Sequence, residues 1–217
     1  VIVLGLLVRV PLGLWSFWER RVDRFGFRPP RLSRPVVRLA HTLTPAVARR
    51  LWRIEGMEFD PDGLEALRAL KGQRVVLCPN HPTGLDPLVL FRLSSLLGED
   101  FNYLACQEGF ANPLKGWLMQ RVGCYSIIRG TADRDSFRMS RELLAAGERW
   151  VVMFPEGEAC GQNDIVMPFQ EGIAQMAFWA LEDLAKKGES PRTDAVRPRP
   201  AAGRHCHSWT VGYEILE

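Results

Sequence analysis

A histidine and an aspartate lie five positions apart in the run N-H-P-T-G-L-D, which occupies residues 80–86. A histidine whose proton affinity is set by a nearby carboxylate can take a proton from a hydroxyl group near neutral pH. On one continuous helix His81 and Asp86 would point about 140° apart, but Pro82 and Gly84 indicate a turn that can fold the two side chains together. The pair is therefore a candidate acid–base site. The alternative is that Asp86 only caps a helix beside a loop histidine.

Two further charged side chains follow apolar segments in the same way. Arg129 directly follows the apolar segment at residues 124–128, and Glu156 follows the segment at residues 150–154. Loops beyond the carboxyl ends of parallel strands meet at one edge of the sheet, so both side chains can converge there with His81. This convergence favours a functional role for the histidine over a purely structural one.

Strands and helices that alternate along the chain must position these side chains. We expect strands at residues 54–59, 74–78, 102–105, 124–128 and 150–154, and helices at residues 45–52, 61–70, 113–122, 133–146 and 171–187. A further helix is expected with Asp86 as its N-cap and Pro87 in its first position. Residues 28–35 contain three prolines and are predicted to form a linker. The alternation indicates an α/β fold with a mostly parallel or mixed sheet flanked by helices.

Composition and residue spacing argue against a disulfide-rich protein and against a metal-binding protein. The chain has 217 residues, 47% of them hydrophobic, which suits a globular domain with a sizeable core. Its five cysteines are scattered and form no C-x-x-C pair, which favours reduced thiols over a disulfide framework. The histidines in H-C-H at residues 205–207 are too few for a closed metal site. We therefore predict no bound metal. There is also no G-x-S-x-G nucleophile elbow.

Positive charge gathers at the amino-terminal end. Residues 1–50 contain ten arginines and two acidic residues, although the net charge of the whole chain is only +3. Such a basic end points to an anionic partner, either nucleic acid or a phospholipid surface. Residues 1–18 are almost wholly apolar and end on aromatic side chains, which favours a helix in the membrane interface. Arg9 and Pro11 argue against a transmembrane span. The alternative is an apolar helix packed on the core.

Four sequence blocks occur in order between residues 72 and 188. An N-H-x4-D block is formed by Asn80, His81 and Asp86, a glycine with a hydrophobic strand ending in arginine by Gly123 and Arg129, F-P-E-G by Phe154, Pro155, Glu156 and Gly157, and F-x-x-G by Phe169 and Gly172. In combination these blocks resemble the PlsC-like glycerolipid acyltransferase family. The chain departs from that family in two places. Pro82-Thr83 stands where many members carry Gln-Ser or Arg-Ser. The family's last block, an apolar strand with a Val-Pro pair, is replaced by V-R-P-R-P at residues 196–200, in a polar stretch without strand character.

The resemblance implies an O-acyltransferase of phospholipid biosynthesis. The donor would be acyl-coenzyme A or acyl carrier protein, and the acceptor a hydroxyl of a glycerol phosphate or lysophospholipid, with 1-acylglycerol-3-phosphate giving phosphatidic acid as the leading reaction. His81 is implied to be the general base and Asp86 its orienter, with no cofactor beyond the acyl donor. Arg129, Glu156 and Gly157 are implied to bind the acceptor phosphate and glycerol, supported by Asn80, Gly123, Phe154, Pro155 and Gly172.

Taken together, these features predict two parts of the chain. Residues 1–60 would form a membrane-association segment, and residues 61–217 an α/β acyltransferase domain whose tail from about residue 189 is divergent or poorly ordered. We expect association with an anionic membrane surface at the cytoplasmic face and no nucleic-acid partner. The alternative function is a catalytically silent membrane lipid-binding protein.

Overall fold

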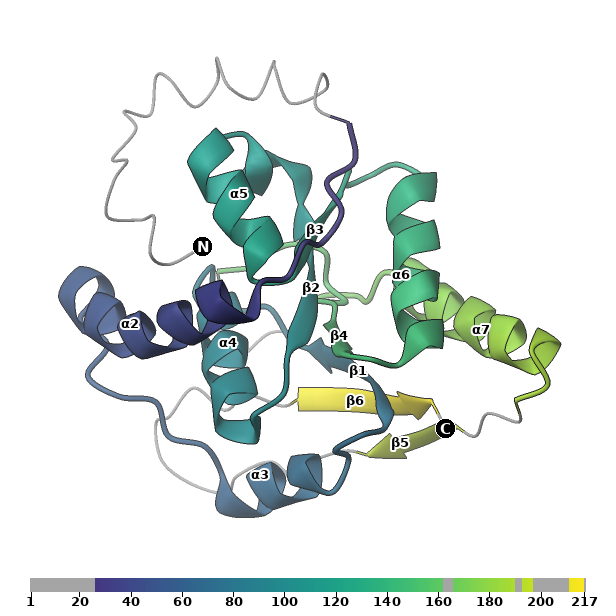
Figure 1. Cartoon of the computed structure of the whole chain (residues 1–217), viewed down its shortest axis with the longest axis horizontal. Helices are drawn as coiled ribbons and strands as arrows, with labels where there is room; N and C mark the ends of the chain where they lie inside the picture. Colours follow the sequence, from purple (N-terminus) through teal and green to yellow (C-terminus); the bar gives the residue numbers. More distant parts are fainter. Residues whose placement is uncertain (1–25, 162–165, 190–192, 197–210, 217) are drawn as a thin grey trace. The chain divides into compact units, whose positions relative to one another are not determined.

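The computed structural model describes residues 26–161, 166–189, 193–196 and 211–216 (Figure 1). The chain forms two compact units. The first comprises Val1–Met57 and Asn102–Ser136, and the second Glu58–Phe101 and Phe137–Glu217. The predicted interfacial helix at residues 1–18 lies outside the described residues. Among the described helices, none combines the length and apolar character needed to cross a membrane.

The first unit contains a long helix and a parallel pair of strands. Its elements are α2 (Arg34–Trp52), all but the first residue of β2 (Phe101–Cys106), the short 3-10 helix η1 (Gln107–Phe110), α5 (Pro113–Arg121) and β3 (Cys124–Ile127). Tyr103 pairs with Cys124 in the parallel ladder, and α5 supplies the crossover that parallel strands require. The side chain of Asn112 caps α5 by accepting the N–H groups of Leu114 and Lys115. These features confirm the strands and the helix predicted at residues 102–128.

The helix α2 is longer than the sequence predicted. It begins at Arg34 and contains Pro45, so the helix start predicted at residue 45 is wrong. The linker predicted at residues 28–35 has irregular conformation up to Ser33 and overlaps the helix only at Arg34 and Pro35. Pro35 lies in the first turn, where a missing N–H breaks no helical bond. The buried residues of α2 follow helical spacing: Val37, Ala40, Thr44, Val47 and Ala48. Burial of this face therefore outweighs the interruption at Pro45.

The short strand predicted at residues 54–59 is also wrong. The chain leaves α2 through Arg53, whose φ of 54° lies in the left-handed region. Residues 54–60 then run in irregular conformation to α3 (Pro61–Arg68), whose N-terminus is capped by the Asp60 carboxylate at 2.7 Å from the Gly63 N–H. The segment serves as a connection between two helices, so its apolar residues have no neighbouring strand to pair with.

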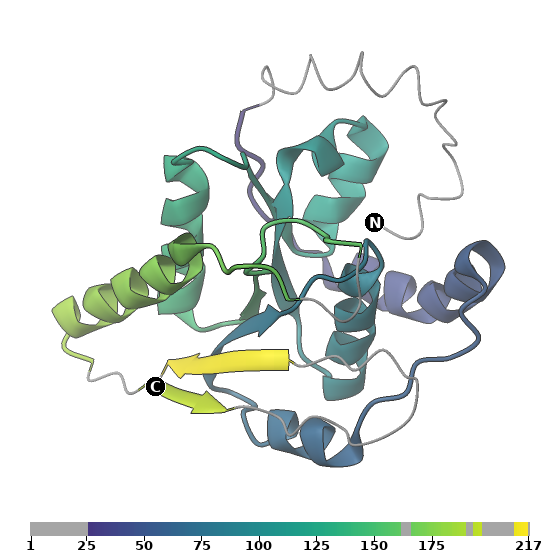
Figure 2. The ribbon, with the colours of Figure 1, turned by 180° about the vertical axis from the view of Figure 1, so that it is seen from behind.

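The strand β1 (Arg74–Pro79) is central to the sheet of the second unit. One edge of β1 pairs in parallel with β4 (Trp150–Val152), and the other pairs antiparallel with β6 (Val211–Leu216). The strand β5 (Thr193–Val196) adds to β6, and Figure 2 shows the two side by side. The pairing is therefore mixed, and the predicted α/β fold is confirmed.

The strands β5 and β6 lie in the tail from about residue 189. Of the stretch at residues 196–200, for which no strand character was predicted, Val196 ends β5 and residues 197–200 lie outside the described residues. The run V-G-Y-E-I-L at residues 211–216 alternates largely between apolar and other residues, which is typical of a strand. The edge of β1 opposite β4 carries N–H and C=O groups that need partners. All six residues of β1 pair with β6, from Arg74 opposite Leu216 to Pro79 opposite Val211. The tail thus completes the backbone pairing of the strand that leads to His81.

Helices complete the second unit: α3, α4 (Asp86–Leu97), most of α6 (Arg134–Ala146) and α7 (Glu171–Lys186). The core is formed by apolar side chains of the strands and α4, with Leu77, Val151 and Val152 fully buried. The Phe101 and Trp150 rings stack with centroids 5.4 Å apart. Arg141 on α6 and Asp183 on α7 form a two-bond ion pair at 3.0 and 2.7 Å. The helices predicted from residue 61 onward are present, with shifts of one or two residues at several ends.

Candidate active site

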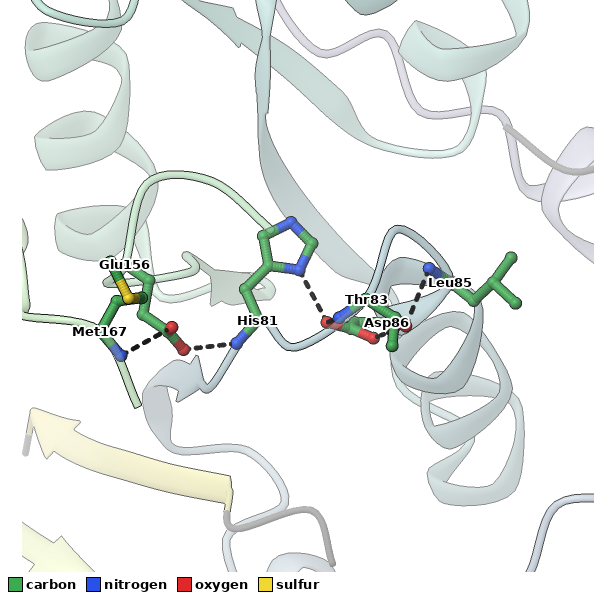
Figure 3. A network of polar contacts seen from close by, with 6 residues as sticks. All are labelled: His81, Thr83, Leu85, Asp86, Glu156 and Met167. Atoms are coloured by element: carbon green, nitrogen blue, oxygen red, sulfur yellow. Dashed lines mark hydrogen bonds and ion pairs between the residues drawn. The ribbon is translucent and has the colours of Figure 1, made fainter. Parts of the chain in front are cut away.

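The turn between β1 and α4 brings the predicted histidine and aspartate together. The chain leaves β1 at Pro79 and enters α4 at Asp86, and His81 Nδ1 lies 2.7 Å from Asp86 Oδ2. The Asp86 side chain is fully buried, and that of His81 is 15% exposed. A carboxylate oxygen can only accept a hydrogen bond, so in the neutral imidazole Nδ1 carries the proton and Nε2 the lone pair. In Figure 3, Nε2 points away from Asp86.

Three donors surround the Asp86 carboxylate. Besides His81 Nδ1, the Thr83 N–H donates to Oδ2 at 3.0 Å, and the Thr83 hydroxyl donates to Oδ1. The same hydroxyl oxygen accepts the Leu85 N–H at 3.2 Å. The N-cap of α4 is Leu85, with Asp86 in the first turn. The prediction of Asp86 as N-cap is therefore wrong, because its carboxylate is turned back toward the preceding loop and not toward the helix N–H groups.

His81 is fixed by its backbone and its ring as well as by Asp86. The Phe154 ring stacks on the imidazole, with centroids 4.1 Å apart and planes 22° from parallel. The His81 N–H donates to Glu156 Oε1 at 2.6 Å, and the His81 C=O accepts the Cys160 N–H at 3.1 Å. The chain that follows β4 therefore contacts His81 in two ways. Phe154 covers one face of its ring, and Glu156 and Cys160 bind its backbone.

The segment at residues 154–157 forms a tight turn. The Gly157 N–H donates to the Phe154 C=O at 3.1 Å, which leaves Pro155 and Glu156 in the central positions, and proline suits the first of these. Gly157 has a φ of +80°, a conformation that L side chains rarely adopt. Glu156 is buried, and its Oε2 accepts the Met167 N–H at 3.0 Å (Figure 3). The Gln170 N–H also reaches back to the Pro155 C=O at 2.7 Å.

Gly172 and Asn80 lie near this network along the chain. Gly172 is in the first turn of α7, and a Cβ built there would meet only Phe137, at an ordinary contact distance of 3.9 Å. Packing within the described residues therefore gives no reason for a glycine at this position. The Asn80 side-chain oxygen is buried and has no hydrogen-bond partner among the described residues.

Arg129 and Gly123 belong to the first unit. Gly123 has a φ of +96°, and its C=O accepts hydrogen bonds from the Tyr103 N–H and the Asn102 side chain. Arg129 follows β3 in a turn where the Ile128 N–H donates to Asp133. Its guanidinium lies 3.6 Å from the Glu108 carboxylate. The structure therefore brings together the predicted residues of the second unit, whereas Arg129 has Glu108 as its ionic neighbour within the first.

A family model described as Acyltransferase matches residues 58–187, more than half of the chain. The chain belongs to the acyltransferase family. The matched range includes every predicted site residue, from Asn80 to Gly172. Searches among curated proteins and among solved structures found no match.

Sequence reasoning missed one side chain of this acyltransferase that contacts the pair directly. Thr83 gives two hydrogen bonds to Asp86, yet it was considered only as a departure from the Ser found in relatives. The available signal was chemical, because threonine and serine carry the same hydroxyl and Thr83 precedes Asp86 by three residues. The contacts of Cys160 and Met167 involve backbone N–H groups, which residue types do not reveal.

Two cysteine thiols of this acyltransferase have raised pKa values. Burial, followed by the Glu108 carboxylate, raises the pKa of Cys106 above its usual range, while Arg129 opposes the shift. Burial raises the pKa of Cys124 to about 11. Among the described residues, no cluster of three or more His, Cys, Asp or Glu side chains is placed to hold a metal ion. Residues 205–207 lie outside the described residues.

Proposed function

We propose that this acyltransferase esterifies a hydroxyl of a glycerol phosphate or lysophospholipid, with 1-acylglycerol-3-phosphate as the leading acceptor and phosphatidic acid as the product. The donor is a fatty acyl thioester of coenzyme A or acyl carrier protein. The observation that carries the proposal is the 2.7 Å contact between His81 Nδ1 and the buried Asp86 carboxylate, which leaves the lone pair on Nε2. The N-H-x4-D and F-P-E-G blocks, which meet around this pair, support the PlsC-like branch.

In the proposed reaction, His81 acts as general base and then as general acid. The acceptor oxygen attacks the thioester carbonyl carbon while Nε2 takes the hydroxyl proton. When the carbon–sulfur bond breaks, the leaving thiolate takes this proton from the imidazolium. Asp86 orients the ring and stabilises its positive charge. General base assistance of this kind typically contributes about 10²–10⁴-fold in rate.

Recognition of the acceptor phosphate is assigned to groups that can approach and neutralise it. Arg129 offers a planar fork of donors, and its present neighbour Glu108 would have to yield to the phosphate because both are anions. Gly157 and Gly172 lack side chains that would keep a ligand from the backbone. The absence of a packing reason for Gly172 supports this assignment.

Membrane association at the cytoplasmic face is also proposed. The helix α2 exposes Leu39 and Leu43 together with arginines. The helix α5 exposes Leu114 and Trp117, with the Arg121 guanidinium 5.7 Å from the Trp117 ring centre. Apolar and aromatic side chains beside arginines are typical of surfaces that bind anionic lipid. This composition supports a phospholipid surface over nucleic acid as the anionic partner.

The test compares thiol release from acyl-coenzyme A with and without lysophosphatidate. We expect acceptor-dependent release from the wild-type chain, loss of release in His81→Ala, and nearly unchanged release in His41→Ala, the matched histidine control on α2. Full activity of His81→Ala would refute the mechanism. Lipid binding without any thiol release in the wild type would favour the catalytically silent alternative. That alternative was based on the divergent tail, and the pairing of β6 with β1 and of β5 with β6 is an argument against a damaged sheet.

A further inference from the structure

Both oxygens of the Glu156 carboxylate are engaged with the protein's own backbone. Oε1 lies 2.6 Å from the His81 nitrogen, and Oε2 lies 3.0 Å from the Met167 nitrogen. The residue is only 4% exposed. A carboxylate needs donors to remain stable in such surroundings, and here two separate chain segments provide them. These contacts account for the burial of Glu156 without any ligand.

The two segments joined by Glu156 are the turn that carries His81 and the loop that leads to α7. The Cys160 N–H bonds to the His81 C=O at 3.1 Å, so the same loop contacts both polar groups of the His81 peptide backbone. Phe154, two residues before Glu156, stacks on the imidazole. The direction of Nε2 therefore depends on where the His81 backbone lies relative to the turn at residues 154–157.

Resting on the proposed function, we propose that Glu156 is a positioning residue that fixes the His81 backbone against the turn at residues 154–157 and against Met167, and that it does not bind the acceptor. Its effect on catalysis passes through His81, since the imidazole keeps its stacking on Phe154 and its alignment with Asp86 only while this backbone is fixed. A carboxylate is required because it accepts at both oxygens. An amide accepts at one atom only and would place its NH2 group against a backbone N–H.

The decisive variants are Glu156→Gln and its matched control Glu158→Gln, the same change at an exposed glutamate two residues away. Two reactions are followed for each variant: acyl transfer to lysophosphatidate and the slow hydrolysis of acyl-coenzyme A by water. A misplaced base slows both reactions. We expect Glu156→Gln to lower kcat of both about a hundredfold, as a displacement of roughly 1 Å can, with the KM for the acceptor unchanged and Glu158→Gln close to wild type.

A spectroscopic measurement separates positioning from a general loss of structure. The His81 ring signals, identified by their absence in His81→Ala, are recorded by heteronuclear NMR. We expect them to shift in Glu156→Gln, because the Phe154 ring current depends on the stacking geometry, and to stay in place in Glu158→Gln. Thermal unfolding of each variant is measured alongside. Glu156→Asp is the second variant, and it should be impaired as well because its shorter side chain cannot reach both donors.

Several outcomes would overturn the inference. A raised KM for lysophosphatidate with unchanged hydrolysis would make Glu156 an acceptor ligand. Unfolding of both Glu156→Gln and Glu156→Asp would make its role purely structural. Unshifted His81 signals in a folded Glu156→Gln would exclude positioning through the histidine. An inactive wild-type chain would instead refute the proposed function, while the NMR comparison would still test the contact between Glu156 and His81.

Discussion

Replacing Thr83 by valine removes one hydroxyl from the surroundings of Asp86 and leaves the shape of the side chain nearly unchanged. In the wild type the hydroxyl donates to Asp86 Oδ1, and its oxygen accepts the Leu85 N–H at 3.2 Å. Valine can do neither. The Thr83 N–H bond to Oδ2 at 3.0 Å comes from the backbone and is available in the variant. The substitution therefore isolates the contribution of the hydroxyl to the position of the carboxylate.

The magnitude follows from the burial of Asp86. Because this side chain is fully buried, water cannot replace the lost donor, and a hydrogen bond to a buried charged group is worth about 1.5–3 kcal/mol. If this loss appears wholly as misalignment of His81 in the transition state, the rate falls by about 10- to 150-fold. We expect kcat of Thr83→Val to lie in this range, with little change in KM for donor or acceptor.

The assay is thiol release under saturating lysophosphatidate, with Thr83→Ser as the matched control. Serine keeps the hydroxyl and should retain most of the activity, whereas valine keeps the methyl group and should not. Chemical denaturation shows how much of the loss appears instead as lower stability of Thr83→Val, and the two effects together should amount to about 1.5–3 kcal/mol. The reasoning is refuted if Thr83→Val keeps the wild-type kcat, or if serine is as damaging as valine.

Three further measurements probe the rest of the molecule. Arg141 holds the pKa of Asp183 below its usual range through its hydrogen bonds, so this pair stabilises the fold above the unfolded pKa and loses its effect as pH falls through the folded one. Asp183→Asn should therefore lower the unfolding free energy at pH 7 by about 1 kcal/mol, a value already reduced for the partial exposure of the pair. In urea denaturation, the difference in unfolding free energy between wild type and variant should shrink below about pH 4. Burial raises the pKa of Cys124 to about 11, so peptide mapping after iodoacetamide treatment at about pH 8 should find it unmodified in the folded protein and modified after denaturation. Arg129→Gln should raise the KM for lysophosphatidate without affecting a neutral monoacylglycerol acceptor. Equal effects on both acceptors would remove Arg129 from phosphate recognition.

The sequence was informative wherever local chemistry decides the structure. Apolar segments at residues 75–78 and 150–152 could be recognised as strands because buried β-branched residues dominate them. Pro82 and Gly84 indicated the turn that lets residues five positions apart meet. The ends of α5 and α6 depend on equally local chemistry, since the Asn112 side chain caps the first turn of α5 and Gly147 has a left-handed conformation after α6.

Errors arose where distant partners decide the structure. Pro45 suggested a helix start, but burial of one helical face from Val37 to Ala48 stabilises a helix that begins at Arg34 and runs through this proline. The strands β5 and β6 depend on an open edge of β1, more than a hundred residues earlier. Helix propensity and local pattern contain no information about either partner, so these elements required the three-dimensional structure.

The largest gap concerns contacts made through backbone atoms. Residue types identified His81, Asp86 and Glu156 as a chemical set, and spacing placed them near strand ends. The bonds that determine how the imidazole points include the His81 N–H, the His81 C=O, and the N–H groups of Cys160 and Met167. Such groups occur in nearly every residue, so a sequence cannot show which of them are used. A glutamate that resembles a substrate ligand in the sequence can for this reason be a fixed part of the protein's own framework, and the distinction matters for any substitution at Glu156. We expect such a change to alter the position of the base and to leave the affinity for the acceptor unchanged.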